Sequence, residues 1–237
     1  MVSRRLHRLT ILLVALLAAG FLAGCGPDKS DPKVMRDLLK ERLTEARAKI
    51  DEAETITLSL SAKNMPDGTS GLLSATGSGN HNPAFKGKVK VVTGGATVTA
   101  DVVAVGSEVM AKPSFAPIFL KVDPASLKAP NPAALFETSV GFSQVLVETK
   151  GLKEGPKSRD GKDVLTTITG SIPGSVVRAI LPSADTTASF PVTYRLTDDN
   201  ELRDASISGP FYPGVTDITY DIAVRTSDKP VSITLPK

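Results

Sequence analysis

The sequence predicts an α+β fold in which one long antiparallel β-sheet carries its helices on one face. Apolar residues recur with a period of two along much of residues 55–235, which is the pattern of half-buried strands. Gly, Asn and Asp turns separate many of these runs, so the strands should follow one another as an antiparallel meander. No shift in composition marks a second domain, and we expect residues 32–237 to form a single domain.

The first helical stretch begins at Pro32. Asp31 is a suitable N-cap because its carboxylate can accept a hydrogen bond from a free amide of the first turn, and proline fits the first helical position. The stretch is amphipathic, and its apolar positions recur at steps of three and four: Met35, Leu38, Leu39, Leu43, Ala46, Ile50 and Ala53. Such a stripe can lie on a membrane or bind a partner, but packing against the protein's own sheet is the simplest expectation.

The strands are the dominant feature of the remaining chain. The clearest alternating runs are residues 55–62, 89–104 with a turn at Gly94-Gly95, 164–168, 190–196 and 218–224. Weaker candidates are residues 71–80, 108–112, 117–122, 150–156, 201–208 and 231–235. We therefore expect about ten or more strands. Two helices should interrupt them, one over residues 138–150 after a proline-rich loop and one over residues 173–181.

The N-terminal 24 residues have the layout of a secretory signal. Three arginines form a basic start, and an apolar run of about 14 residues follows, shorter than the roughly 20 residues that a bilayer-spanning helix needs. The run ends in Leu-Ala-Gly at 22–24 followed by Cys25, which matches a bacterial lipobox. We predict cleavage after residue 24, acylation of Cys25, a tether at residues 25–31, and a protein exported and lipid-anchored at the outer face of the plasma membrane. An ordinary cleaved signal that leaves a free thiol is the alternative.

Charge and cysteine content exclude several classes of function. The chain has 28 Lys and Arg against 25 Asp and Glu, and the first 24 residues hold three arginines and no acid. The mature domain is therefore neutral, which removes the usual basis for a nucleic-acid partner. Cys25 is the only cysteine, so once it is acylated no thiol remains for a disulfide, a metal site or a nucleophile.

Catalytic and metal-binding motifs are sparse as well. The mature chain has one histidine, His81, within the turn-like segment 79–83, and we expect it to be a solvated turn residue. No Gly-x-Ser-x-Gly elbow, P-loop or second histidine is present in the mature sequence, and the acidic cluster at 198–201 fits a hairpin tip better than a calcium loop. We expect neither an enzyme nor a bound cofactor or metal.

The inward positions of the predicted sheet raise a functional question. A sheet of this size normally curls, and its concave face has to be filled. The inward residues are mostly small or branched, and aromatics make up only 5% of the chain. Either the helices fill the hollow or an apolar ligand does, and both alternatives stay open at this point.

Several motifs together resemble one family. They are the lipobox, the amphipathic helix and long meander, the segment Val-Asp-Pro-Ala-Ser-Leu at 122–127 with Asn131-Pro132, a glycine-containing helix at 141–147, and the hairpin 155–168 around Asp160-Gly161-Lys162. Over essentially the whole mature chain, this order is similar to the LppX/LprAFG lipoproteins of mycobacteria and actinobacteria, closest to the LprG-like members. The resemblance implies a strongly curved antiparallel half-barrel of the LolA/LppX type, with helices over its concave face enclosing a large hydrophobic cavity.

The resemblance also implies a function. Members of this kind carry the acyl chains of triacylated lipids or glycolipids (triacylglycerides, phosphatidylinositol mannosides and lipoarabinomannan) across the cell envelope, usually alongside a major-facilitator transporter and without catalytic residues. By strand and helix pattern, the candidate lining residues are Ile56, Leu58, Val89, Val91, Val98, Val102, Phe142, Leu146, Val164 and Ile168. The competing hypotheses are a surface lipoprotein that acts through protein–protein contacts and, less well supported, a hydrolase that uses His81.

Overall fold

The structure is a computed structural model that describes residues 31–127 and 129–237. The predicted signal, the lipobox with Cys25 and the tether up to residue 30 lie outside the described residues. The chain divides into two units between Met35 and Arg36, and each unit is described by itself. In the first unit helix α1 (Pro32–Glu52) begins, and the Asp31 carboxylate accepts a 2.7 Å hydrogen bond from the Lys33 amide, which confirms the predicted N-cap.

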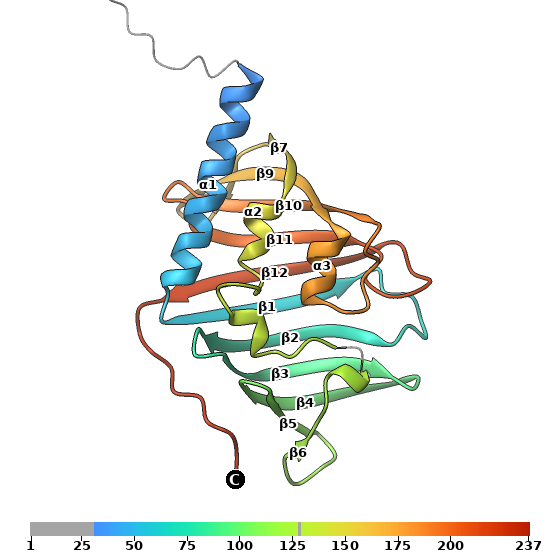
Figure 1. The fold of residues 1–237 in the computed structure, drawn as a ribbon. Coiled ribbons are helices and arrows are strands. Elements are labelled where there is room, and N and C mark those ends of the chain that lie inside the picture. Colours follow the sequence, from blue (N-terminus) through green and yellow to red (C-terminus); the bar gives the residue numbers. More distant parts are fainter. Residues whose placement is uncertain (1–30, 128) are drawn as a thin grey trace, which may run out of the picture. The chain divides into compact units, whose positions relative to one another are not determined.

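The second unit is built on a 12-stranded sheet in which every pair is antiparallel. The predicted fold class is confirmed: the chain is mostly antiparallel sheet with few helices (Figure 1). The strands are β1 (Thr55–Lys63), β2 (Gly71–Asn80), β3 (Ala84–Thr93), β4 (Ala96–Val105), β5 (Glu108–Pro113), β6 (Leu120–Lys121), β7 (Lys150–Glu154), β8 (Ser158–Asp160), β9 (Asp163–Pro173), β10 (Ser189–Thr197), β11 (Leu202–Gly209) and β12 (Ile218–Ser227).

Two meanders make up this sheet. Strands β1 to β6 follow one another to one end, and β12 back to β9 and then β7 run to the other end, with β8 paired to β9. The meanders join where β1 pairs with β12, from Thr55 opposite Ser227 to Lys63 opposite Thr219. The first and last of the described strands, β1 and β12, therefore lie side by side in the middle of the sheet (Figure 1).

Local turn chemistry sets the hairpins of each meander. Gly94 and Gly95 both have positive φ, +56° and +77°, as a two-residue hairpin turn between β3 and β4 requires. Gly161 (φ +61°) turns β8 into β9, and Asn200 (φ +61°) turns β10 into β11. Asn tolerates this left-handed conformation better than most residues. The acidic cluster at 198–201 is thus a hairpin tip, as the sequence predicts.

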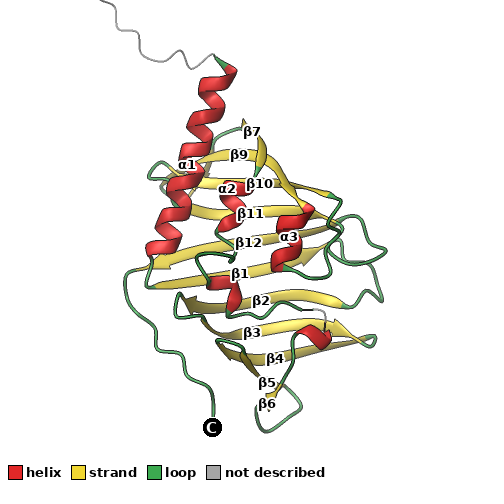
Figure 2. Cartoon of the chain, viewed as in Figure 1, coloured by secondary structure: helices red, strands yellow, loops and turns green. Residues whose placement is uncertain are grey.

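The helices lie over one face of the sheet (Figure 2). Besides α1 they are two 3-10 turns, η1 (Ala125–Leu127) and η2 (Ala134–Phe136), and two short helices, α2 (Gln144–Glu148) and α3 (Gly174–Ile180). Residues 122–149 connect β6 with β7, which are at opposite ends of the sheet. This connection has to cross the sheet, and it carries η2 and α2 over the inner face.

Within the second unit, α1 packs against the sheet through its apolar stripe, as expected. Leu39, Leu43, Ala46 and Ile50 are almost completely buried, and Ala46 and Ile50 border a small cavity together with Val224 of β12. The Arg42 guanidinium donates a 2.9 Å hydrogen bond to the Thr197 carbonyl and a second bond to the Asn200 side chain, which fixes the helix to the β10–β11 turn.

Three local predictions are wrong. The helix expected over 138–150 is reduced to α2, because residues 137–142 instead form a tight turn in which Gly141 donates a 2.7 Å hydrogen bond to the Glu137 carbonyl. A Cβ at Gly141 would lie 2.3 Å from that same oxygen, so the turn requires glycine. The candidate strand at 117–122 contains Pro117 and is reduced to β6. The candidate strand at 231–235 does not form, since residues 228–237 pair with no strand of the sheet.

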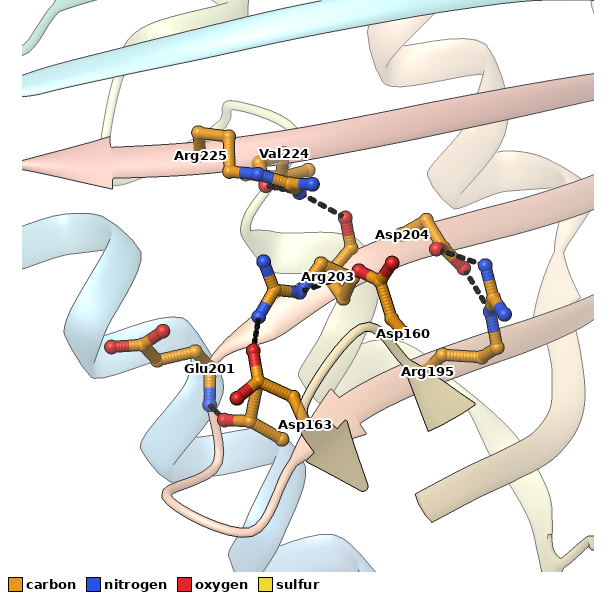
Figure 3. A network of polar contacts seen from close by, with 9 residues as sticks. Asp160, Asp163, Arg195, Glu201, Arg203, Asp204, Val224 and Arg225 are labelled. Atoms are coloured by element: carbon orange, nitrogen blue, oxygen red, sulfur yellow. Dashed lines mark hydrogen bonds and ion pairs between the residues drawn. The ribbon is translucent and has the colours of Figure 1, made fainter. Parts of the chain in front are cut away.

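Ion pairs on the sheet connect strands near the β10–β11 turn (Figure 3). The Arg203 guanidinium lies 2.6 Å from Asp163 and 3.5 Å from Asp160, and therefore ties β11 to the β8–β9 hairpin. Arg195 lies on β10, between β11 and β9, and binds the Asp204 carboxylate of β11 through two nitrogens. Bidentate pairs of this kind fix the register of adjacent strands as well as adding attraction.

Candidate functional site

The candidate site is an apolar cavity of about 150 Å³ between the inner face of the sheet and the helices that cover it. Strands β1, β2, β9, β10, β11 and β12 form its floor, and α2, α3 and adjoining loops form its cover. Its wall is composed of Leu60, Leu72, Pro130, Leu135, Phe142, Val145, Leu146, Ile172, Val177, Ile180, Leu181, Tyr194, Leu202, Ala205, Ile207, Phe211, Tyr212, Tyr220, Ile222 and Val224. Apart from the tyrosine hydroxyls, every one of these side chains is hydrocarbon.

Strand register explains why the floor is apolar. In β12, Tyr220, Ile222 and Val224 alternate with polar or small residues, and the pleat turns these three toward the cover. Ile222 lies opposite Leu60 of β1 on one side and Ala205 of β11 on the other. Three strands thus bring their inward residues together at the centre of the sheet, where the two meanders meet.

The tyrosine hydroxyls at the wall bond to one another and to the backbone. The Leu72 amide donates a 2.9 Å hydrogen bond to the Tyr212 hydroxyl, and the Tyr220 hydroxyl donates a 2.8 Å bond to the Leu72 carbonyl. The two hydroxyls are 2.7 Å apart, so the remaining proton, that of Tyr212, joins them. Burial, with the neighbouring Tyr212 adding to it, raises the pKa of Tyr220 far above its ordinary value. This hydroxyl stays neutral and fully bonded.

Tyr194 is satisfied in the same manner at the α2 end of the cavity. Its hydroxyl lies 2.8 Å from the Thr149 hydroxyl, which itself donates a 2.7 Å bond to the Val145 carbonyl. Burial raises the pKa of Tyr194 well above the ordinary tyrosine value, and the bond to Thr149 opposes this only in part. These bonds supply the polar partners that buried hydroxyls need, which leaves the cavity surface apolar.

A second, larger hollow of about 650 Å³ lies beside the cavity. Pro130, Leu135 and Ile180 belong to the walls of both. The hollow is more polar, because Ser107, Asp123, Asn131, Arg178 and Ser183 contribute to its wall. The apolar cavity and the more polar hollow therefore meet at the edge of the cover.

A cluster of three phenylalanines holds this cover on the sheet. The Phe136 ring of η2 lies 6.0 Å from the rings of both Phe85 and Phe142, stacked on the first and edge-on to the second. Phe136 also sits directly on Gly79 of β2, where an added Cβ would come within 2.6 Å of the ring. The glycine thus provides the space into which the cover is anchored.

The structure brings two of the ten predicted lining residues to the cavity wall: Phe142 and Leu146. Ile56 and Ile168 are completely buried in the core on the inner face, and Leu58 lies opposite Val224. Val89, Val91, Val98 and Val102 lie together on β3 and β4, and Val164 lies on β9 opposite Arg159. A role in lipid contact stays a prediction for all ten.

Most residues of the wall are not among the ten predicted from the sequence. The β12 floor residues, and Ala205 with Ile207 on β11, follow the same period-two pattern as the predicted residues, so the alternation alone could have identified them as inward-facing. Leu202 is out of phase with them, because the pairing of β10 with β11 shifts register there. Val177 and Ile180 of α3 and the C-cap residue Leu181 also have helical spacing. What the pattern could not show is which part of the inner face the connection 122–149 covers.

His81 lies in a turn but is not solvated as expected. Its ring is half-buried, with Nδ1 2.7 Å from the Phe136 carbonyl oxygen and Nε2 3.0 Å from the Ile50 carbonyl oxygen. It joins the end of α1 to η2 because η2, which is distant in sequence, folds over the β2–β3 turn. Both nitrogens face backbone carbonyls, so the ring occupies a structural position.

Within residues 31–127 and 129–237, no three His, Cys, Asp or Glu side chains are grouped so that they could hold a metal ion. No helix in this part of the chain is both long and apolar enough to cross a membrane.

The fold and the site define a class of protein: an antiparallel sheet with helices on one face that enclose an apolar cavity. The model of the LppX_LprAFG lipoprotein family matches residues 39–233. The chain belongs to this family of non-enzymatic, lipid-binding lipoproteins. No curated protein matches the chain.

Two solved structures share the fold at low sequence identity. LprF from Mycobacterium bovis is 15% identical, with a TM-score of 0.68 over 84% of this chain and 97% of that one. The lipoprotein LppX from Mycobacterium tuberculosis is 18% identical, with a TM-score of 0.61 over 84% of this chain and 99% of that one. At such identities these similarities establish the fold, and the family match carries the assignment.

Proposed function

We propose that this protein is a lipid-anchored carrier of LprG-like function. Acylated at Cys25, it takes up the acyl chains of a triacylated lipid or glycolipid and moves them across the cell envelope, with a major-facilitator transporter as its membrane partner. Triacylglycerides, phosphatidylinositol mannosides and lipoarabinomannan form the ligand class. The observation that carries the proposal is the cavity wall, whose only polar side-chain atoms are tyrosine hydroxyls that already have partners.

Such a wall binds by burial alone. Removing apolar surface from water contributes about 25 cal/mol per Å², and a wall without free donors or acceptors offers nothing to a polar group. It therefore favours hydrocarbon and discriminates by volume and chain number. The more polar hollow beside it, with Arg178 and Asn131, suits a headgroup that remains in water.

The cavity volume sets a requirement on the mechanism. A cavity of about 150 Å³ holds a molecule the size of benzene, whereas pockets for drug-sized ligands have roughly 300–1,000 Å³. Loading a multi-chain lipid therefore requires α2, α3 and the connection 122–149 to move off the sheet. Apolar contacts such as the phenylalanine cluster hold part of the cover, and acyl chains can replace these contacts at modest net cost.

Native mass spectrometry tests the proposal on the non-acylated Cys25→Ala chain purified from a lipid-rich host. We expect co-purifying lipid with two or three acyl chains. Ala205→Phe, which fills the cavity floor on β11, should reduce loading. Ala223→Phe makes the same change on the neighbouring strand β12, on the face of the sheet that points away from the cavity, and should leave loading intact. Thermal unfolding of each variant establishes that it is folded.

The opposite result is equally informative. If the wild-type chain is repeatedly empty and accepts no fluorescent lipid, the carrier function is wrong. The alternative would then be a surface lipoprotein that acts through protein–protein contacts without a ligand.

A further inference from the structure

The loop between β5 and β6 exposes large apolar side chains to solvent. Phe115 is 78% exposed, Ile118 62% and Leu120 47%. Among the described residues, only Leu127 and Val140 are other large apolar side chains with comparable exposure. We call residues 114–120 the apolar loop; it follows β5 at the β6 end of the sheet (Figure 1). Contiguous exposed apolar groups of this kind mark interaction surfaces.

The backbone of the apolar loop is fixed although its side chains are not packed. The Ser114 amide donates a 2.9 Å bond to the Thr99 carbonyl of β4, and the Ala116 amide closes a turn with a 2.9 Å bond to the Pro113 carbonyl. Pro113 and Pro117 restrict the chain further. The loop therefore presents Phe115 and Ile118 in a defined conformation and does not need to be ordered on binding.

Lysines stand at both ends of the apolar loop, and the sequence from Lys112 to Lys121 contains no acidic residue. The Lys112 ammonium lies 5.7 Å from the centroid of the Phe119 ring, and Lys121 pairs with Glu108 of β5 at 2.9 Å. An apolar tip between lysines is suited to a membrane interface. There, aromatic and aliphatic groups enter the acyl boundary, and lysine stems extend to the headgroups.

The size of the apolar loop distinguishes a bilayer from a protein partner. A standard protein interface uses roughly 20–30 residues on each side, far more than this loop provides. A membrane interface needs only a few inserted side chains when other attachments contribute. We infer that residues 114–120 dock on an anionic lipid surface, with Phe115 and Ile118 inserted and Lys112 and Lys121 at the headgroups.

Docking in this manner would have a spatial consequence for the neighbouring hollow. Asp123, Pro124 and Ala125, which line the hollow, follow β6 with only Val122 between. A docked apolar loop holds this edge of the hollow close to the headgroups. The inference does not depend on the proposed lipid cargo, because insertion of the loop can be measured whether or not lipid is carried.

The absence of tryptophan from the chain makes the test direct. Phe115→Trp introduces a single fluorophore at the tip of the apolar loop of the full chain, and Asp199→Trp places one on the polar β10–β11 turn as a control. Both are added to phosphatidylcholine vesicles with phosphatidylglycerol and with brominated acyl chains. We expect a blue-shifted emission and quenching at least about twofold stronger for Phe115→Trp, because only this ring should reach the acyl region.

Two second-site changes sharpen the result. Ile118→Ser in the Phe115→Trp chain should weaken quenching, and Lys112→Gln with Lys121→Gln should reduce it to the level of vesicles without phosphatidylglycerol. Quenching of Phe115→Trp no stronger than that of Asp199→Trp would overturn membrane docking. Quenching that is unaffected by loss of both lysines would overturn the role of anionic headgroups.

Discussion

The hydroxyls of Tyr212 and Tyr220 are joined by a 2.7 Å hydrogen bond, and both also bond to the backbone of Leu72. The resulting ring connects β12 and the loop before it to the irregular part of β2, where the register shifts between Leu72 and Ser74. All the hydroxyl protons in the ring are used. This arrangement stabilises the wall of the cavity without leaving a polar atom for a ligand.

A double-mutant cycle measures the free energy that couples the Tyr212 and Tyr220 hydroxyls in this ring of hydrogen bonds. Tyr212→Phe leaves the Leu72 amide without its acceptor, and Tyr220→Phe leaves the Leu72 carbonyl without its donor, so each should cost about 1–3 kcal/mol of unfolding free energy. The double variant should cost about 1 kcal/mol less than the sum, because the bond between the hydroxyls is lost only once. Denaturant unfolding provides the four values. Strict additivity would contradict the closed ring.

Stability should decrease at alkaline pH because of the buried tyrosines. Burial raises the pKa of both Tyr194 and Tyr220, so the folded state keeps these protons while the unfolded state loses them above about pH 10. Their contribution is complete below the unfolded pKa and is lost as pH rises above it, by about 1.4 kcal/mol per pH unit for each tyrosine. Comparing the unfolding free energy of wild type and Tyr194→Phe across this pH range isolates the contribution of Tyr194. Equal slopes for the two proteins would show that Tyr194 ionises normally in the folded state.

Gly79→Val should loosen the cover. A side chain at Gly79 meets the Phe136 ring, and displacing that ring also disturbs its contacts with Phe85 and Phe142. We expect a loss of about 1–3 kcal/mol in unfolding free energy, with faster hydrogen exchange in α2. Thr76→Val, an exposed position of the same strand, serves as the control. Unchanged exchange in α2 would mean that this cluster does not hold the cover.

Val91→Trp tests how far a loaded lipid extends. The cavity under the cover is too small for several acyl chains, so the remainder should lie along the inner face over β3 and β4, where Val89, Val91 and Val98 are only half-buried. Val91→Trp should reduce loading of triacylated lipid and spare a single-chain fatty acid. Val92→Trp, on the other face of β3, is the matched control. Equal loading in both variants would restrict the lipid to the central strands.

The sequence predicted the sheet well because its determinants are local. Gly94-Gly95, Gly161 and Asn200 define their hairpins through backbone conformations that few other residues adopt, and the alternation of apolar residues defines the faces. The N-cap at Asp31 is equally local. These features depend on a few neighbouring residues, and the structure agrees with them.

The cavity could not be located in this manner. Its position depends on Phe136 meeting Gly79 and on His81 meeting both Ile50 and Phe136, which are contacts between distant segments. The expected helix at 138–150 illustrates the same limit. Its apolar spacing is real, but the helix is shortened at both ends, by the tight turn at Gly141 and by the pairing of Lys150 with β9. Tertiary contacts override local preference there.

The pairing of β1 with β12 has a consequence for the order in which the chain can fold as it emerges from its N-terminus. A chain that emerges N-terminus first presents β1 to β6 as a growing meander whose inner edge has no partner until residues 218–227 arrive. The sequence separation of this pair is nearly the largest the sheet allows, and such contacts form slowly. The floor of the cavity includes both strands, so no lipid site exists on the nascent chain. A lipid can therefore enter only after residues 218–227 have emerged and β12 has paired with β1.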